Sequence, residues 1–144
     1  MVSLGDLGRK DIRHEPGDAG TTLSFQQARE FLNGFGLDYN IVTGNHDLEG
    51  LDEFDTDESN IQAFLDCFGF EAPYFMREIA NRTLLVGLST VRFRSAPYSS
   101  HEVHVDDEQI VWFQETVRQH SAEDGWKIVV VSHAPIAGSG LRVL

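Results

Sequence analysis

The chain has 144 residues, a length that fits one globular domain spanning residues 1–144. Its composition, with 41% hydrophobic and 24% charged residues, excludes disordered and fibrous proteins. Its formal net charge of −12 repels polyanions, and no cluster of Lys and Arg offsets this charge, which argues against a nucleic-acid-binding protein. No stretch has the length and apolar character of a membrane span. The single cysteine, Cys67, excludes an intramolecular disulfide and fits the cytoplasm or another reducing compartment.

The N-terminal part of the chain predicts a strand followed by a loop. Residues 2–4 form a short apolar run that ends in Gly5 and Asp6. Residues 8–22 contain Gly, Asp and Pro in a pattern typical of a loop. His14 lies in this loop, and a lone loop histidine is usually solvated, so we do not assign it to a site.

A helix is predicted next, beginning at Ser24, which would form a capping box with Gln27. Gly36 is expected to end the helix. Apolar residues recur at helical spacing and should form the face that packs on a sheet: Phe25, Ala28, Leu32 and Phe35. Together with the strands on either side, this helix predicts a right-handed βαβ unit.

The second strand leads into the most informative motif of the chain. An apolar run at residues 39–43 is followed directly by Gly44-Asn45-His46-Asp47. These residues should leave the carboxyl end of a strand, where α/β sheets place their chemistry. Their amide, imidazole and carboxylate groups can ligate a metal and move a proton. A polar hairpin turn is the alternative interpretation, because Gly-Asn pairs adopt positive φ readily.

An acidic stretch and a second helix follow the motif. Residues 49–58 hold six acidic side chains, but their spacing does not match a calcium-binding EF-hand loop, so we expect a solvated loop. The helix is predicted at residues 57–68 with Gly69 after its end, and its apolar face should carry Ile61, Phe64, Leu65 and Phe68. Cys67 is expected to be a half-buried residue of this helix and not a nucleophile.

A hairpin is predicted from residues 74–79 and 82–89, and its second strand is apolar enough to be buried on both faces. After it, Arg92 and Arg94 alternate along the chain, so both guanidinium groups should lie on one side. They could bind a phosphate oxygen, but an exposed sheet edge is the preferred interpretation.

The C-terminal part predicts a third helix and a last strand. His101 and His104 are three residues apart in an expected loop, which is a weak metal-binding signal. The helix should begin at Asp106 and present one apolar face with Ile110, Phe113 and Val117. Residues 127–132 predict the most clearly buried strand of the chain, which ends at His133.

Three predicted strands therefore end in residues that commonly ligate metals: Asp6, Asn45 with His46, and His133. If these strands are neighbours in one sheet, their carboxyl ends meet at one edge. The sequence then predicts a single convergent site.

In this order the motifs resemble those of the calcineurin-like metallophosphoesterase family, whose pattern is DxH, GDxxD, GNH[DE], an isolated His after a strand, and GHxH. Gly5-Asp6 matches the start of the second block, the motif from Gly44 to Asp47 matches the third, and His133 matches the fourth. The resemblance spans nearly the whole chain. The second aspartate of GDxxD is missing or displaced, and neither DxH nor GHxH is present.

The resemblance implies an α/β fold with mixed sheets, built as a four-layer α/β/β/α sandwich that is incomplete at both ends. It implies a metal-dependent phosphoesterase, a phosphatase or phosphodiesterase, that hydrolyses a small phosphate ester with a metal-activated hydroxide. Two divalent metal ions (Mn, Fe or Zn) are implied, with Asp6 bridging them and with Asn45 and His133 on the second ion. His46 would donate a proton or a hydrogen bond to the substrate, and Asp47 would orient His46 or stabilise the turn.

The absence of DxH and GHxH leaves the first metal ion with Asp6 alone, so we expect a fragment of a hydrolase with weak or no activity by itself. In a fragment, a targeting signal cannot be assessed. The alternative is a non-catalytic binding or scaffold module that keeps the fold. The joint presence of four site residues favours the enzyme: Asp6, Asn45, His46 and His133. Sheets that lack their terminal strands expose their edges, so self-association is a further expectation.

Overall fold

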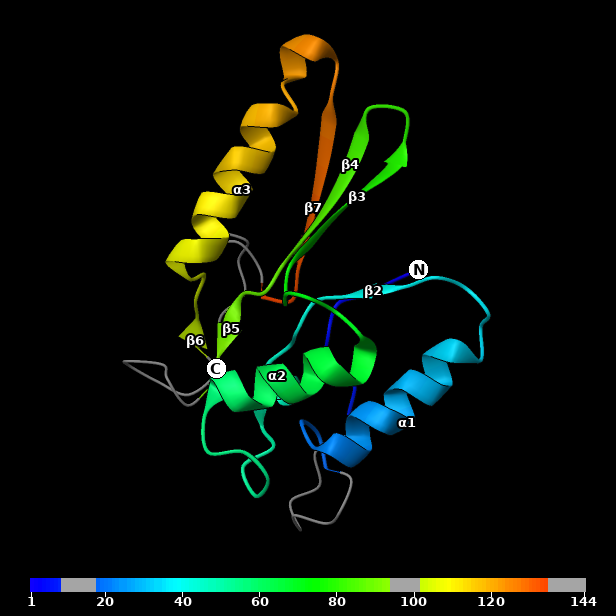
Figure 1. Cartoon of the computed structure of the whole chain (residues 1–144), viewed down its shortest axis with the longest axis vertical. Coiled ribbons are helices and arrows are strands. Elements are labelled where there is room, and N and C mark those ends of the chain that lie inside the picture. The colour runs from blue at the N-terminus through cyan, green and yellow to red at the C-terminus, as the bar shows by residue number, and fades with distance from the viewer. Residues whose placement is uncertain (9–17, 94–101, 135–144) are drawn as a thin grey trace.

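The computed structural model describes residues 1–8, 18–93 and 102–134 of a small mixed α/β protein (Figure 1). None of the helices it describes is long and apolar enough to cross a bilayer. The helices are α1 (Thr22–Asn33), α2 (Asp57–Phe68) and α3 (Asp107–Gln119), with short 3-10 helices η1 (His46–Leu48) and η2 (Ala122–Asp124). The strands are β1 (Val2–Ser3), β2 (Asn40–Ile41), β3 (Phe75–Ala80), β4 (Thr83–Leu88), β5 (Val91–Arg92), β6 (Glu102–Val103) and β7 (Lys127–Ser132).

The main sheet is mixed and has the order β3-β4-β7, with β3 antiparallel and β7 parallel to β4. Strands β1 and β2 form a separate parallel pair, and β5 and β6 form an antiparallel pair. In the central strand β4, Leu84, Leu85 and Val86 are buried, which confirms the prediction of a strand covered on both faces.

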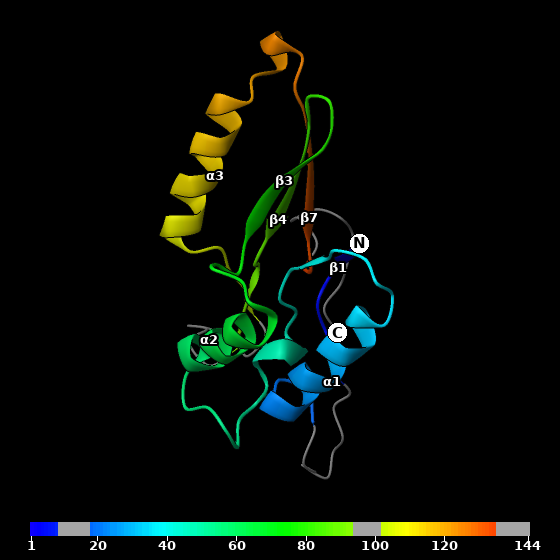
Figure 2. The same cartoon turned by 45° about the vertical axis from the view of Figure 1, so that its right-hand side comes forward.

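Helix α3 lies along one face of the main sheet (Figures 1 and 2). Met76 and Val86 are register partners on this face, and the Thr116 hydroxyl of α3 lies 3.8 Å from the Met76 sulfur. Leu85 points to the opposite face, because side chains alternate along a strand. There it lines a pocket together with Val2 and Asn40 of the β1–β2 pair.

The other half of the molecule has an aromatic core. Helices α1 and α2 pack on each other and on β2 through Phe25, Leu32, Ile41, Phe64 and Leu65. The Phe25 and Phe64 rings are fully buried and meet edge to face with their centroids 5.5 Å apart. Full burial of one such side chain contributes about 1.5–3 kcal/mol. Cys67 packs half-buried beside this core as predicted, and burial raises the pKa of its thiol.

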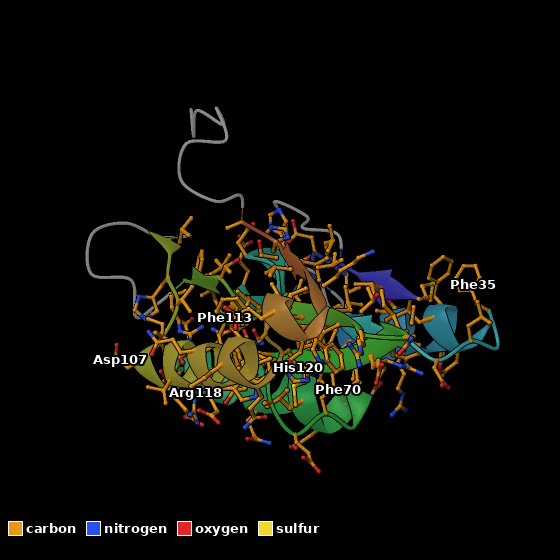
Figure 3. All side chains as sticks on the ribbon, turned by 90° about the horizontal axis from the view of Figure 1, so that it is seen from above. Phe35, Phe70, Asp107, Phe113, Arg118 and His120 are labelled. Carbon is orange, nitrogen blue, oxygen red and sulfur yellow. The ribbon has the colours of Figure 1, made fainter. Side chains whose placement is uncertain are left out.

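Both ends of α1 differ from the prediction. The helix begins at Thr22, because the Thr21 side chain accepts a hydrogen bond of 3.2 Å from the Ser24 N–H and takes the capping position. The helix ends at Asn33 with Gly34 as its C-cap, so Phe35 does not share the buried helical face and is 53% exposed. Figure 3 places Phe35 beyond the end of α1, on the opposite side of the view from Asp107 and Arg118 of α3.

Helix α2 has the predicted bounds, and Gly69 ends it in the left-handed region with φ 71°. Its start is fixed by a capping box between Thr56 and Ser59. The predicted hairpin is also present as β3 and β4, with Arg82 at φ 51° in its turn.

Helix α3 starts after the Asp106 cap as predicted, but its buried face is not the predicted one. Ile110 and Val117 are 39% and 41% exposed, whereas Gln109 and Thr116 are buried. Two hydrogen bonds explain why Gln109 faces the sheet. The Gln109 amide accepts one from the Ser89 N–H and donates one to the Ser89 carbonyl, both at 2.8 Å. This pair of bonds rotates the apolar residues away from the sheet.

Strand β7 is also less buried than predicted, since Val129 and Val130 are 45% and 40% exposed. Within the described residues it pairs on one side only, with β4, so it forms an edge of the main sheet. Arg92 is mostly buried and forms an ion pair with Asp106, so the preferred interpretation of an exposed arginine edge is wrong for this residue. The predictions for His14, Arg94 and His101 lie outside the described residues.

Candidate functional site

The parallel pair of β1 and β2 brings the first two motifs together. Val2 is paired with Asn40 and Ser3 with Ile41, so both strands end at the same edge. Asp6 follows one strand, and the motif from Gly44 to Asp47 follows the other.

The two loops are joined by Asp47, whose carboxylate is fully buried. It accepts hydrogen bonds from the N–H groups of Asp6 (2.8 Å), Leu7 (2.9 Å) and Gly44 (2.8 Å). Burial raises the pKa of Asp47, while these three donors act in the opposite direction. The hydrogen bonds support the turn-stabilising alternative for Asp47, because they use both oxygens to fix the backbone.

Asp6 has a strained backbone, with φ at 56°, and its Oδ1 accepts a 3.0 Å hydrogen bond from the His46 N–H. The two loops approach so closely that Gly44 cannot carry a side chain. A Cβ there would lie 2.2 Å from Asp6 Oδ1 and 2.8 Å from His133 Cε1. A glycine is therefore needed at the centre of the site.

His133 reaches these loops from the end of β7. Its Nδ1 lies 2.7 Å from the Leu4 carbonyl oxygen, and its Nε2 lies 3.1 Å from Asn45 Oδ1 and 3.6 Å from Asp6 Oδ2. The structure thus brings Asp6, Asn45 and His133 together. We predicted this convergence on the condition that the three strands are neighbours in one sheet. That condition is wrong, because β7 belongs to a different sheet from β1 and β2.

Buried hydroxyl groups hold the end of β7 in place. The Thr90 hydroxyl accepts a 3.1 Å hydrogen bond from the Ala134 N–H, one residue after His133. The Thr43 and Ser89 hydroxyls share a 2.6 Å hydrogen bond between the ends of β2 and β4. Sequence analysis missed Ser89 and Thr90, although two hydroxyl residues at the end of a buried strand are a usable signal.

The three site residues present an excess of hydrogen-bond acceptors. The Leu4 carbonyl can only accept, so it selects the tautomer of His133 that carries its proton on Nδ1. Nε2 then directs a lone pair towards the oxygens of Asn45 and Asp6. A second proton on His133, rotation of the Asn45 amide, or a cation between the three atoms would relieve this conflict.

A cation fits the observed spacing. Nitrogen and oxygen ligands lie about 2.0–2.2 Å from a zinc ion, which places neighbouring ligand atoms roughly 3 Å apart. The separations from His133 Nε2, 3.1 and 3.6 Å, are close to this value. The Leu4 carbonyl also supplies the outer hydrogen bond that metal-binding histidines usually make.

The described part of the chain contains no group of three or more His, Cys, Asp or Glu that could hold a metal ion. The site has two such residues, Asp6 and His133, and the amide of Asn45. These atoms suit one cation, and the expectation of two metal ions stays a prediction. His104 is exposed and takes part in no such group within the described residues.

His46 lies beside the three ligand-type residues. It contacts Glu49, an acid that the sequence analysis assigned to a solvated loop. Its Nδ1 lies 3.1 Å from Oε1 of Glu49, whose side chain is only 2% exposed. The prediction of a solvated loop is therefore wrong for Glu49, because η1 turns the chain back after the motif. It is also wrong for Asp57, whose buried carboxylate accepts from the Phe93 N–H at 3.0 Å.

No protein-family model, curated protein or solved structure matches this chain in the three comparisons that we made. The motifs and the geometry of the site are therefore the features that indicate a function.

Proposed function

We propose that this chain is a metal-dependent phosphoesterase of the calcineurin-like type, with its site formed by Asp6, Asn45, His46 and His133. The observation that carries the proposal is the convergence of three acceptor atoms, from Asp6, Asn45 and His133, at the spacing of metal ligands. A carboxylate, an amide oxygen and an imidazole suit manganese, iron or zinc.

The packing order of the elements supports a four-layer α/β/β/α arrangement. Helix α3 covers one face of the β3-β4-β7 sheet, and the other face lines a pocket with the β1–β2 pair. Helices α1 and α2 pack on the far side of that pair through Ile41. Figure 2 shows α3 beside the β3-β4-β7 sheet, with β1, α1 and α2 below that sheet.

Each residue has a distinct part in the proposed reaction. Asp6, Asn45 and His133 would hold a divalent cation, which when bound stabilises the negative charge that develops on a phosphoryl group. His46 is tied to this group through its backbone, since its N–H donates to Asp6. Its ring is 36% exposed and would exchange a proton or a hydrogen bond with an oxygen of the ester.

A bound cation would also reconcile the site with the charge of the protein. The formal net charge of −12 disfavours an anionic substrate, but a divalent cation inverts the local potential. The substrate class that fits is a small phosphate ester, either a monoester or a diester.

A non-catalytic binding module is the second candidate. It is favoured by one observation: the described residues gather ligands for one cation, whereas the proposed family uses two. A module that retains the fold can bind partners without hydrolysing anything.

Manganese binding and turnover would separate the two candidates. We would titrate Mn²⁺ by calorimetry and assay p-nitrophenyl phosphate and bis-p-nitrophenyl phosphate with the parent chain, with Asn45→Ala and with Asn33→Ala as a matched control. Asn33 is exposed at the end of α1. We expect Asn45→Ala to bind Mn²⁺ at least about 10-fold more weakly and to lose turnover, as loss of metal-site groups usually does. Turnover that Asn45→Ala abolishes and Asn33→Ala retains would favour the enzyme over the binding module, and no manganese binding would overturn the metal site.

A further inference from the structure

A buried acid, Glu49, contacts the one histidine that the proposed mechanism uses for proton exchange. The His46 Nδ1 atom and the Glu49 Oε1 atom are 3.1 Å apart. His46 is the first residue of η1 and Glu49 is its C-cap, so one short turn places both of them. The pair does not have the alignment of a hydrogen bond in the structure, but at this distance a carboxylate attracts an imidazole N–H and repels an imidazole lone pair.

Solvent reaches only part of the His46 ring. The ring as a whole is 36% exposed, but its Nδ1 atom is inaccessible to solvent. The exposed surface of the ring therefore belongs to its other atoms. Because the buried Nδ1 lies beside Glu49, Nε2 is the ring nitrogen that remains to meet a substrate.

Asn60 and Gly20 hold the segment around Glu49 in place from two sides. The Asn60 amide of α2 accepts from the Gly50 N–H at 3.1 Å and donates to the Gly20 carbonyl at 2.8 Å. Gly20 itself lies so close that a Cβ there would be 2.7 Å from the Glu49 N atom and 2.9 Å from the His46 carbonyl oxygen. The backbone of the turn is therefore held in a fixed position, and so is the start of the Glu49 side chain.

A buried carboxylate is costly unless nearby groups compensate for its lost hydration. Asp47, the other buried acid of the turn, uses its carboxylate to bind three backbone N–H groups. Glu49 instead directs an oxygen at a side chain of the site. This difference assigns separate tasks to the two acids: Asp47 fixes the backbone, and Glu49 contacts the imidazole.

We infer that Glu49 is a positioning residue, which holds the His46 ring with its proton on Nδ1 and thereby makes Nε2 the atom that faces the phosphate ester. The inference rests on the proposed function for the use of Nε2, but the position of the proton can be measured without any activity. Glu49 touches neither the substrate nor a metal in this scheme and acts through His46.

The direct test is the tautomer of His46, read from long-range ¹H–¹⁵N correlation spectra at about pH 8.5, where histidine side chains are ordinarily neutral. A His46→Gln spectrum identifies the signals. We expect the parent chain to carry the proton on Nδ1. In Glu49→Ala the ring should change to the Nε2-protonated form that imidazole side chains prefer in water, while Glu49→Gln should keep the Nδ1 form because its amide oxygen can still attract the N–H.

Asp52→Asn is the matched control, since it removes one negative charge from an exposed residue of the same acidic stretch and should leave the spectrum unchanged. A parent chain with its proton on His46 Nε2 would overturn the inference. So would an unchanged His46 signal in Glu49→Ala. The first of these outcomes needs only the parent chain and is independent of whether the variant folds.

Manganese-dependent hydrolysis adds a second readout. We expect Glu49→Ala to lower kcat for phenyl phosphate by about 10- to 100-fold with little change in KM, as loss of a group that orients a site residue does. The loss should be smaller for p-nitrophenyl phosphate, because p-nitrophenolate leaves without needing a proton. An equal loss for both esters would overturn the role of Nε2. A parent chain without turnover would count against the proposed function alone, and the spectra would still decide the role of Glu49.

Discussion

The two halves of this molecule use their apolar residues differently. Where α1, α2 and the β1–β2 pair meet, aromatic and aliphatic side chains form a closed core that includes Phe25 and Phe64 at 0% exposure. Where α3 meets the β3-β4-β7 sheet, apolar residues of both the helix and the edge strands remain exposed: Met76, Ile79, Ile110, Val111, Val117, Val129 and Val130.

The difference shows that an apolar pattern identifies side chains capable of burial, but not the surface that buries them. Ile110 and Val117 have the same seven-residue spacing as Ile61 and Phe68, which pack against the aromatic core from α2, and yet they face outwards. Polar groups decide the orientation of α3, because Gln109 must satisfy the buried backbone of Ser89. Substitutions can test this contrast between the aromatic core and the polar clamp that Gln109 forms with Ser89.

The largest effect should come from the aromatic core. Phe64→Ala is expected to cost about 3–5 kcal/mol of unfolding free energy, because it leaves a cavity among packed rings. Val111→Ala on the exposed side of α3 should change it by less than about 0.5 kcal/mol. Urea unfolding followed by circular dichroism measures both. Similar losses in the two variants would mean that the contrast between the halves is wrong.

The polar clamp should give the next largest effect. Gln109→Ala leaves the Ser89 N–H and carbonyl without their partner in a buried position, which is expected to cost about 1–3 kcal/mol for each group. Gln114→Ala, on the exposed side of the same helix, is the control and should be close to neutral. The measurement is again urea unfolding. If Gln109→Ala were as mild as Gln114→Ala, the clamp would not be what orients α3.

The sequence predicted the elements whose ends carry their own signals. Helix α2 has its predicted bounds because a capping box and Gly69 fix its two ends, and α3 begins where the Asp106 cap was expected. The start of α1 was misplaced because Thr21 and Ser24 are both competent caps, and the observed hydrogen bond selects Thr21. Local signals therefore sufficed for boundaries, except where two neighbouring residues compete.

The site was predictable in part for the same reason. Asp6, Asn45 and His133 were found because ligand-type residues after apolar runs mark strand ends. Their meeting across two sheets was not predictable, since it depends on which strands pair. Glu49 was missed because an acidic stretch gives no indication of which of its members turns inwards. That choice is made by η1 and by the Asn60 clamp, which are tertiary features.

Edge pairing should give a smaller effect on stability but a clear effect on association. Strand β7 contains four consecutive apolar residues, and within the described residues one of its sides is unpaired, so we expect copies of the chain to self-associate through it. Val129→Lys should reduce association in sedimentation velocity while changing unfolding free energy little. Val111→Lys adds the same charge on α3, away from the strand, and should not reduce association. Equal effects of the two lysines would point to net charge and not to the strand edge.

The smallest effect should come from an ion pair on the exposed side of α3. Arg118 donates to both oxygens of Glu115, and Gln119 donates to one of them at 2.6 Å. The Arg118 hydrogen bonds, with that of Gln119, lower the pKa of Glu115. A carboxyl group with a lower pKa in the folded chain adds stability above its unfolded pKa of about 4.3, and this stability is lost as the pH falls through the folded value.

The unfolding free energies of the parent chain and of Glu115→Gln should therefore differ slightly at about pH 6 and converge as the pH falls below the folded pKa of Glu115, because other carboxylates contribute equally to both proteins. The difference should also shrink in high salt, since the pair is exposed to solvent. Urea unfolding across this pH range measures it. A difference that grows as the pH falls would contradict the assignment, and a difference as large as that of Gln109→Ala would mean that surface charge, and not the buried clamp, holds α3 in place.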